Sequence, residues 1–397
     1  MDLESFRFLL TDEGQALLAD LAAREISEAE ALREASRLRR SYPPPLVSAA
    51  LETAILRRRA ARKFSRAQQM YFTREALEQA TAEPVARYRA RRFAGYGLVA
   101  DLGSSIGGDA IALAERGPVL AVDRDPLRLA MLIENAQAYE VAQMITPLQA
   151  DLSTLELPPE VGAFFFDPAR REGGRRRFSA AAYVPPLATI ERWRRRVPAG
   201  AIKVAPGIAD EELPPECEAE FISLDGELRE ACLWLGPLRR SARRATLLPQ
   251  GVSLDDEPTP AAPLSEPLRY LYEPDPAVIR AHLVAQLAAR IDAAQLDAEI
   301  AYLTSDRLVE TPFARVWEIE EWLPFNLKAL RRRLQELGVG EVTVKKRGSP
   351  IAPEELRRLL RLKGSGQRTV VLTQLRDRPV ALICKASIRH FNLHPVR

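Results

Sequence analysis

The chain has 397 residues, 47% of them hydrophobic and 28% charged, with 57 Lys and Arg against 54 Asp and Glu. This composition excludes general disorder and collagen-like sequence, and the length predicts two or three domains. Three cysteines, three histidines, no apolar run of bilayer length and no signal-peptide pattern predict a cytoplasmic protein without a disulfide framework, a metal or a membrane segment.

Residues 1–94 are predicted to form an N-terminal helical domain. Leu17, Leu18 and Leu21 recur at the spacing of one helix face. The three prolines at 43–45 separate two helical segments, and no strand pattern occurs before residue 95.

Residues 95–248 are predicted to form an α/β domain around a parallel sheet. Short apolar runs alternate here with amphipathic helices, as in doubly wound folds. The runs predicted as strands are 97–102, 119–123, 145–149, 163–167 and 201–205. A hairpin over 220–224 and 229–235 follows, because Asp225-Gly226 favours a tight turn.

Residues 249–267 are rich in prolines and acids, so we expect a linker there. The remainder, 268–397, is predicted to be a smaller α/β domain. Its predicted strands are 314–318, 339–345, 369–375 and 379–385, and its predicted helices are 276–291, 326–337 and 353–362.

The C-terminal domain is strongly basic. Residues 325–397 carry 17 Lys and Arg and 5 Asp and Glu, a net charge of +12, so the rest of the chain carries −9. Such a local excess favours contact with nucleic acid, and Lys345, Lys346 and Arg347 are predicted to bind the substrate. The alternative is that an Arg-rich chain simply has solvated helix faces, since 50 of its 57 cations are Arg.

A glycine-rich turn carries the strongest chemical signal. The run from Asp101 to Asp109, DLGSSIGGD, follows the first strand and opens a helix. Small residues let a ligand approach the backbone, and the helix N-terminus supplies free N–H groups. Asp123 stands twenty residues after Gly103, at the end of the second strand, where an acid can accept hydrogen bonds from ribose hydroxyls. The turn therefore predicts an adenosine-containing cofactor.

The spacing of the turn favours S-adenosylmethionine over a dinucleotide. Three residues separate Gly103 from Gly107, whereas a dinucleotide turn needs G-x-G-x-x-G. Asp101 would repel a pyrophosphate and attract a cationic amino group, and Asp151, after the third strand, can accept a hydrogen bond from the adenine amine. The predicted cofactor-binding residues are Asp101, Gly103, Ser104, Ser105, Gly107, Asp109, Asp123, Arg124, Asp151 and Leu152. The alternative is that single acids after strands, such as Asp109, only cap helices or form turns.

On these motifs, residues 97–240 resemble the class I S-adenosylmethionine-dependent methyltransferases. The family pattern D-x-G-x-G-x-G is matched by Asp101, Gly103 and Gly107, with Ser105 in place of the middle glycine. The text AVDRDP at 121–126 is similar to that of RNA methyltransferases of the trimethylguanosine-synthase type.

The segments YLYEP at 270–274 and YLTSD at 302–306 resemble bacterial methyltransferases with a THUMP-like C-terminal domain. Together these resemblances imply a Rossmann-like seven-stranded sheet, S-adenosylmethionine as cofactor and, because THUMP domains bind RNA, a tRNA or rRNA partner.

Asp167 and Pro168 follow the fourth strand, where the resemblance places the catalytic motif. Asp167 and the prolyl-region carbonyl would hold a target amine in line with the methyl group, and Asp167 could also take a proton. Arg170 stands where amine-methylating relatives carry an aromatic residue, so the usual base-stacking ring is missing. Arg170 and Arg171 are instead predicted to bind an anionic substrate through charge or guanidinium stacking.

Lys203 interrupts the otherwise apolar fifth strand. It could pair with Asp167, or it could reach solvent at the end of the strand. The sequence thus predicts an S-adenosylmethionine-dependent methyltransferase that modifies an RNA nucleotide. The alternatives are a cofactor-binding RNA-binding protein with reduced catalysis and a methyltransferase with a non-RNA substrate. The oligomeric state is not predicted.

Overall fold

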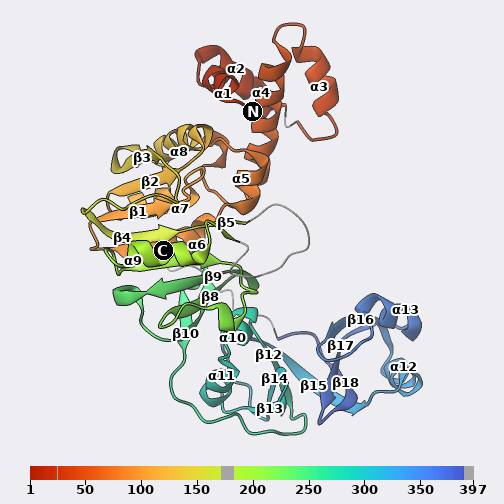
Figure 1. The fold of residues 1–397 in the computed structure, drawn as a ribbon. Helices are drawn as coiled ribbons and strands as arrows, with labels where there is room; N and C mark the ends of the chain where they lie inside the picture. The colour runs from red at the N-terminus through yellow and green to blue at the C-terminus, as the bar shows by residue number, and fades with distance from the viewer. Residues whose placement is uncertain (25, 171–182, 389–397) are drawn as a thin grey trace. The chain divides into compact units, whose positions relative to one another are not determined.

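The computed structural model describes residues 1–24, 26–170 and 183–388 (Figure 1). The chain forms two compact units. The first comprises Met1–Cys217 and Cys232–Arg240, and the second comprises Glu218–Ala231 and Ser241–Arg397. None of the described helices combines the length and the apolar character that crossing a bilayer requires.

The described part of residues 1–94 contains helices and no strand, as predicted. The helices are α1 (Leu3–Leu9), α2 (Asp12–Ala23), α3 (Ala31–Leu38), α4 (Pro44–Ala60), α5 (Arg74–Gln79) and α6 (Glu83–Ala90). Thr11 caps α2 by accepting a hydrogen bond from the N–H of Gly14, and Pro44 occupies the first turn of α4, where a missing N–H costs nothing. These helices belong to the same compact unit as the strands that follow.

A buried asparagine ties the helical region to the next part of the chain. The side chain of Asn135 accepts a hydrogen bond from the N–H of Tyr71 at 2.6 Å. It also donates to the carbonyl oxygens of Tyr71 and Ile106, at 3.0 and 2.9 Å. One fully buried amide thereby holds the chain before α5 to the glycine-rich turn.

A sheet with the strand order β11-β10-β8-β9-β7-β4-β1-β2-β3 runs through residues 98–255. Its strands are β1 (Leu98–Leu102), β2 (Val119–Asp123), β3 (Ile145–Gln149), β4 (Val161–Phe166), β7 (Gly200–Val204), β8 (Glu218–Leu224), β9 (Glu227–Leu235), β10 (Arg243–Leu248) and β11 (Val252–Asp255).

The five predicted parallel strands and the hairpin are confirmed. β1 pairs in parallel with β2 and β4, β2 with β3, and β4 with β7. Asp225 (φ 55°) and Gly226 (φ 76°) turn the chain between β8 and β9 with two positive φ angles, as a tight hairpin requires. The expected seven strands are present, and β10 and β11 extend the sheet beyond them.

The prediction of a linker over 249–267 is wrong for Val252–Asp255, which form β11 antiparallel to β10. Leu254 is buried there, so this short strand has an apolar anchor. The acids and prolines that directly follow this strand are typical of a linker, so the short apolar pattern of the strand was not recognised in the sequence. The other domain boundaries stay predictions.

Three helices alternate with the parallel strands along the chain: α7 (Gly108–Ala114), α8 (Pro126–Ala138) and α9 (Ile190–Arg194). Asp125 caps α8 by accepting a hydrogen bond from the N–H of Leu127 at 2.9 Å. Phe164 and Phe166 are fully buried, and their rings lie 5.9 and 5.1 Å from that of Trp193 in edge-on geometry. The aromatic run of β4 is therefore core, which fixes the strand whose end carries Asp167.

The second unit contains a seven-stranded sheet in the order β13-β14-β12-β15-β18-β17-β16. Its elements are β12 (Tyr270–Pro274), α10 (Pro276–Arg280), α11 (Val284–Arg290), β13 (Ala294–Asp297), β14 (Ile300–Ser305), β15 (Ala314–Pro324), α12 (Leu327–Glu336), β16 (Val339–Lys346), α13 (Pro353–Leu360), β17 (Gly366–Leu375) and β18 (Arg378–Cys384).

The predicted strands and helices of this unit are confirmed with one correction. The single helix expected over 276–291 is two helices, because the chain breaks at His282, whose φ is 61°. Leu330 and Leu334 of α12 and Leu356 and Leu360 of α13 are buried in one cluster against the sheet.

Candidate functional site

Two glycines shape the turn after β1. Gly103 and Gly107 have φ angles of 90° and 92°, which favour glycine. A Cβ atom on Gly103 would lie 2.6 Å from the carbonyl oxygen of Asp167, and one on Gly107 would lie 2.9 Å from Cγ of Leu132. The turn therefore packs its backbone directly against the end of β4, with no room for a side chain at either position.

Ser105, the predicted departure from the glycine pattern, adopts the left-handed conformation with φ 48°. Its N–H donates a hydrogen bond of 2.9 Å to Asp123 Oδ2. The position thus has the backbone shape that glycine adopts without strain, which explains the family preference for glycine.

Ser105→Gly should raise the free energy of unfolding by up to about 1 kcal/mol, and Ser105→Val should lower it by about 1–3 kcal/mol, because a β-branched residue fits a positive φ poorly. Urea denaturation measures both changes. Ser104→Gly is the matched control, since the neighbouring serine has no positive φ. Equal stabilisation by both glycine substitutions would contradict the role of strain at Ser105.

Asp123 stabilises the glycine-rich turn through hydrogen bonds to backbone N–H groups. One carboxylate oxygen accepts from Ser105, and the other accepts from the N–H of Asp125 at 2.9 Å. A carboxylate has about four acceptor sites, so Asp123 retains capacity for the ribose hydroxyls that the sequence predicts it to bind. Arg124, beside it, is exposed.

The third predicted acid, Asp151, is exposed after β3. It accepts hydrogen bonds from the Ser153 hydroxyl and N–H at 2.7 and 2.8 Å, and these bonds hold the pKa of Asp151 below its usual value. Leu152 Cδ1 lies 4.0 Å from the position of a Cβ on Gly103. The structure thus brings Leu152 to the glycine-rich turn, and the contact of Asp151 with adenine stays a prediction.

Asp101 is the most unusual acid of the site. It is fully buried, and neither carboxylate oxygen has a hydrogen-bond partner among the described residues. Burial raises the pKa of Asp101 well above its usual value, and the nearby charges of Asp109 and Asp167 raise it further. An orphaned buried acid of this kind fits a cationic ligand group.

Asp109 is already paired. Its carboxylate binds the buried guanidinium of Arg89 and accepts a hydrogen bond of 3.0 Å from the Thr81 hydroxyl. The guanidinium carbon of Arg89 lies 4.2 Å from the centre of the Phe165 ring. Sequence reasoning missed Arg89, because nothing separates it from the many other arginines of the chain.

Asp167 and Lys203 meet at the ends of the neighbouring strands β4 and β7. Lys203 Nζ lies 2.7 Å from Asp167 Oδ2 and 3.3 Å from the carbonyl oxygen of Gln79. This contact confirms the first of the two predicted possibilities for Lys203. Burial raises the pKa of Asp167, and the charge of Lys203 opposes that rise. Pro168 is buried beside the pair.

The structure describes only part of the two arginines that are predicted to bind the substrate, Arg170 and Arg171. The backbone of Arg170 belongs to β5 (Ala169–Arg170), which pairs with β6 (Tyr183–Val184), but its side chain and the whole of Arg171 lie outside the described residues.

In the second unit, Lys345 Nζ lies 3.0 Å from Glu273 Oε2, and Arg347 reaches the other oxygen of Glu273 at 4.0 Å. Lys346 is exposed. Two of these three cations therefore have an acid partner within the unit, which their spacing in the sequence did not indicate.

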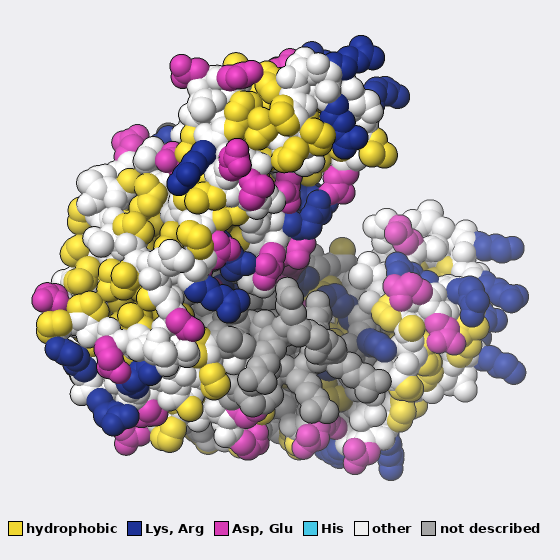
Figure 2. Space-filling view, turned by 45° about the horizontal axis from the view of Figure 1, so that its top comes forward, with side chains coloured by type: hydrophobic (Ala, Val, Ile, Leu, Met, Phe, Trp, Pro, Cys, Tyr) yellow, Lys and Arg dark blue, Asp and Glu magenta, His cyan; other side chains and the backbone are white. Residues whose placement is uncertain are grey.

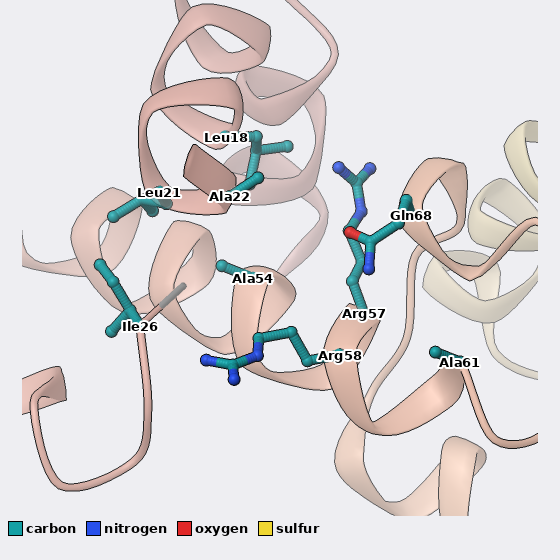
Figure 3. A pocket seen from close by; sticks show the side chains of 9 residues that line it. All are labelled: Leu18, Leu21, Ala22, Ile26, Ala54, Arg57, Arg58, Ala61 and Gln68. Atoms are coloured by element: carbon teal, nitrogen blue, oxygen red, sulfur yellow. The ribbon is translucent and has the colours of Figure 1, made fainter. Parts of the chain in front are cut away.

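A cavity of about 310 Å³ lies among the N-terminal helices (Figure 3). Leu18 and Leu21 of α2, Ile26, and Arg57 and Arg58 of α4 line it. No predicted site residue is among its lining residues. In the described part of the chain, no group of three or more His, Cys, Asp or Glu side chains could hold a metal ion.

Comparisons with known proteins show the fold and the family of the chain. A crystal structure described as that of a methyltransferase from Porphyromonas gingivalis W83 superposes with a TM-score of 0.73 and 20% identity, over 94% of this chain and 98% of that one. This likeness shows the fold. Two proteins from Mycobacterium tuberculosis strains, each an uncharacterized S-adenosylmethionine-dependent methyltransferase, are 42% identical over 342 residues, which cover 82% of this chain and 92% of theirs.

The chain belongs to the S-adenosylmethionine-dependent methyltransferases. Three family models match parts of it: a domain of unknown function at 2–60, RNA cap guanine-N2 methyltransferase at 96–179, and THUMP domain-like at 314–386. The protein is therefore an enzyme with S-adenosylmethionine as cofactor, a Rossmann-like methyltransferase domain and a THUMP-like domain near its C-terminus.

The turn after β1 fits this cofactor. The unpartnered carboxyl of Asp101 suits its amino group. The individual roles of these residues remain predictions.

Proposed function

We propose that this methyltransferase modifies a nucleotide of RNA, in a tRNA or an rRNA. The observation that carries the proposal is a group of exposed cations in the THUMP-like region without an acid partner among the described residues. They are Lys328 at the start of α12, Lys346 at the end of β16, and Arg358, Arg361 and Lys363 around the end of α13. Figure 2 shows dark blue side chains projecting from this part of the molecule. Exposed cations of this kind attract the phosphates of a nucleic acid. Binding is favourable because it releases the counterions that surround those phosphates.

The matched family models support the same substrate class. One is described as an RNA cap guanine-N2 methyltransferase and the other as THUMP domain-like. The first covers the glycine-rich turn and Asp167, and the second covers β16, α13 and the cations around them. The family match over residues 96–179 and the basic surface are thus two separate observations that support an RNA substrate.

Asp167 is the residue best placed to meet the acceptor. Its Oδ2 accepts a hydrogen bond from Lys203 Nζ, and its Oδ1 has no hydrogen-bond partner among the described residues. S-adenosylmethionine supplies a methyl group on a positively charged sulfur. When bound, it would give this methyl group to the acceptor nitrogen, and the electron pair of the broken carbon–sulfur bond would stay on sulfur. Asp167 Oδ1 accepts the hydrogen bond of the acceptor N–H, takes the released proton and passes it to water. Its main contribution is to fix the direction of attack.

Incubation with methyl-labelled S-adenosylmethionine and total small RNA from cells lacking this enzyme tests the proposal. We expect label in the RNA fraction that ribonuclease releases and protease does not. Label in protein or in small molecules would instead support a non-RNA substrate. Cofactor binding with no label in any fraction would support an RNA-binding protein with reduced catalysis.

Charge reversal on the basic surface provides a second test of the proposed function. The double variant Lys346→Glu, Arg358→Glu should weaken RNA binding by about tenfold or more and reduce the slope of log affinity against log salt by roughly two, if each cation neutralises one phosphate. Arg116→Glu is the matched control, because Arg116 is an exposed cation just beyond the end of α7, in the other compact unit. Equal losses in both variants would argue against a specific RNA surface.

A further inference from the structure

We propose that Lys203 is a positioning residue for methyl transfer. Its ammonium group holds one oxygen of Asp167, so that the other oxygen is left, ionised and in a fixed orientation, to receive the hydrogen atom of the methyl acceptor. The inference rests on the proposed function only in taking Asp167 as the group that meets the acceptor.

The placement of Lys203 requires a reason. It is the fourth residue of β7, between the buried residues Ile202 and Val204, and its side chain is only 16% exposed. Burial of an ammonium group is costly unless an acid and hydrogen bonds compensate it. The parallel register, with Phe166 beside Ile202, sets Lys203 beside Asp167 at the ends of the two strands.

Two of the contacts of Lys203 help to fix the direction of its ammonium group. Asp167 Oδ2 lies 2.7 Å from Nζ, and the carbonyl oxygen of Gln79, the last residue of α5, lies 3.3 Å from it. Asp167 is held at its backbone as well, because its N–H donates to the carbonyl oxygen of Leu102 at 3.0 Å. The pair is therefore anchored on both sides, and the side chain of Asp167 has little freedom to turn.

The surrounding charges explain why a cation is needed here. Asp101 on β1 and Asp109 on α7 act on Asp167 with like charge. Arg89 on α6 binds Asp109 and acts on Asp167 with opposite charge, without a hydrogen bond to it among the described residues. Among the residues that the structure describes, Lys203 on β7 is the cation in direct contact with Asp167. Without it, burial and the two neighbouring acids would favour the protonated form of Asp167, which cannot accept a proton from the acceptor.

Carbon-13 NMR of the full-length protein, labelled at the aspartate carboxyl carbons, tests this role without any substrate. The resonance that disappears in Asp167→Asn identifies Asp167. In Lys203→Met, we expect its titration midpoint to rise by at least one pH unit, a tenfold change in proton affinity. Lys203→Arg keeps the charge and should move the midpoint by less than half a unit.

The pH profile of methyl transfer is the second readout. In Lys203→Met, the acidic limb of the profile should move to higher pH by the same interval, so that activity recovers in part at pH 9. A structural loss would lower the rate equally at every pH. Lys203→Arg should keep the position of the limb.

An unchanged midpoint in Lys203→Met would overturn the proposal, as would a uniform loss of rate with an unmoved limb. If Lys203→Met fails to fold, Lys203→Gln and Lys203→Arg decide by the same two readouts. Absence of RNA methylation by the natural chain would refute the proposed function alone, because the NMR titration still measures the coupling of Lys203 to Asp167.

Discussion

Replacing Asp167 with alanine should lower the single-turnover rate of methyl transfer by about 10²- to 10⁴-fold, the usual contribution of a positioned proton acceptor. The substitution removes the carboxylate that would orient the acceptor and take its proton, while the backbone contact with the glycine-rich turn remains. Cofactor affinity, measured by calorimetry, should therefore change little. Rapid-quench measurements with labelled cofactor give the rate.

Two variants control this experiment. Asp167→Asn keeps the shape and one acceptor oxygen, so it should lose the response to pH and part of the rate. Asp12→Ala, on the exposed surface of α2, should leave both quantities unchanged. A rate for Asp167→Ala within about threefold of the natural chain, far below the usual effect, would remove Asp167 from the catalytic machinery.

Replacing Asp101 with asparagine should have two opposite effects. Loss of the carboxylate should weaken cofactor binding by about tenfold or more, since a charge-assisted hydrogen bond contributes about 1.5–3 kcal/mol. The cofactor-free protein should become more stable at neutral pH by about 1–3 kcal/mol, because an amide costs less to bury without a partner than an ionised carboxylate. Calorimetry and thermal unfolding measure the two effects on one sample.

The pH dependence distinguishes this explanation from a packing effect. The pKa of Asp101 is raised in the folded protein, so its contribution to stability is complete below the unfolded pKa and is lost as pH rises through the folded pKa. The stability gap between Asp101→Asn and the natural chain should therefore widen from acidic to neutral pH. A gap that stays constant with pH, or cofactor affinity equal to that of the natural chain, would contradict the assignment.

Much of the methyltransferase fold was predictable because its signals are local. The strands β1, β2, β4 and β7 are apolar runs buried on both faces, and Asp225-Gly226 marks its hairpin. The segments that carry the resemblance to THUMP-like methyltransferases lie on β12 and β14. These two strands and β13 were not predicted, because runs of four to six residues are too short to show a clear period.

The site was predictable only in part. In a parallel sheet the carboxyl ends of the strands meet at one edge, so acids that follow successive strands are expected together. Partners on other elements carry no such signal. Arg89 and Asp109 are 20 residues apart, and Lys345 and Glu273 are 72 residues apart. In a chain with so many arginines, only the folded structure selects which cation meets which acid.

The contact between Gln79 and Lys203 bears on whether the methyltransferase is modular. Lys63 Nζ donates to the carbonyl oxygens of Leu77, Glu78 and Ala80, at 2.7, 3.0 and 2.9 Å, and so holds the end of α5 in shape. The carbonyl of Gln79, within that same stretch, supports the lysine beside Asp167.

The ends of α5 and α6 are therefore part of the surroundings of Asp167 and Asp109, because Gln79 accepts a hydrogen bond from Lys203 and Arg89 binds Asp109. A methyltransferase core cut at residue 94 would lose the support of Lys203 together with the buried Arg89. We therefore expect an active fragment of this protein to begin upstream of Lys63.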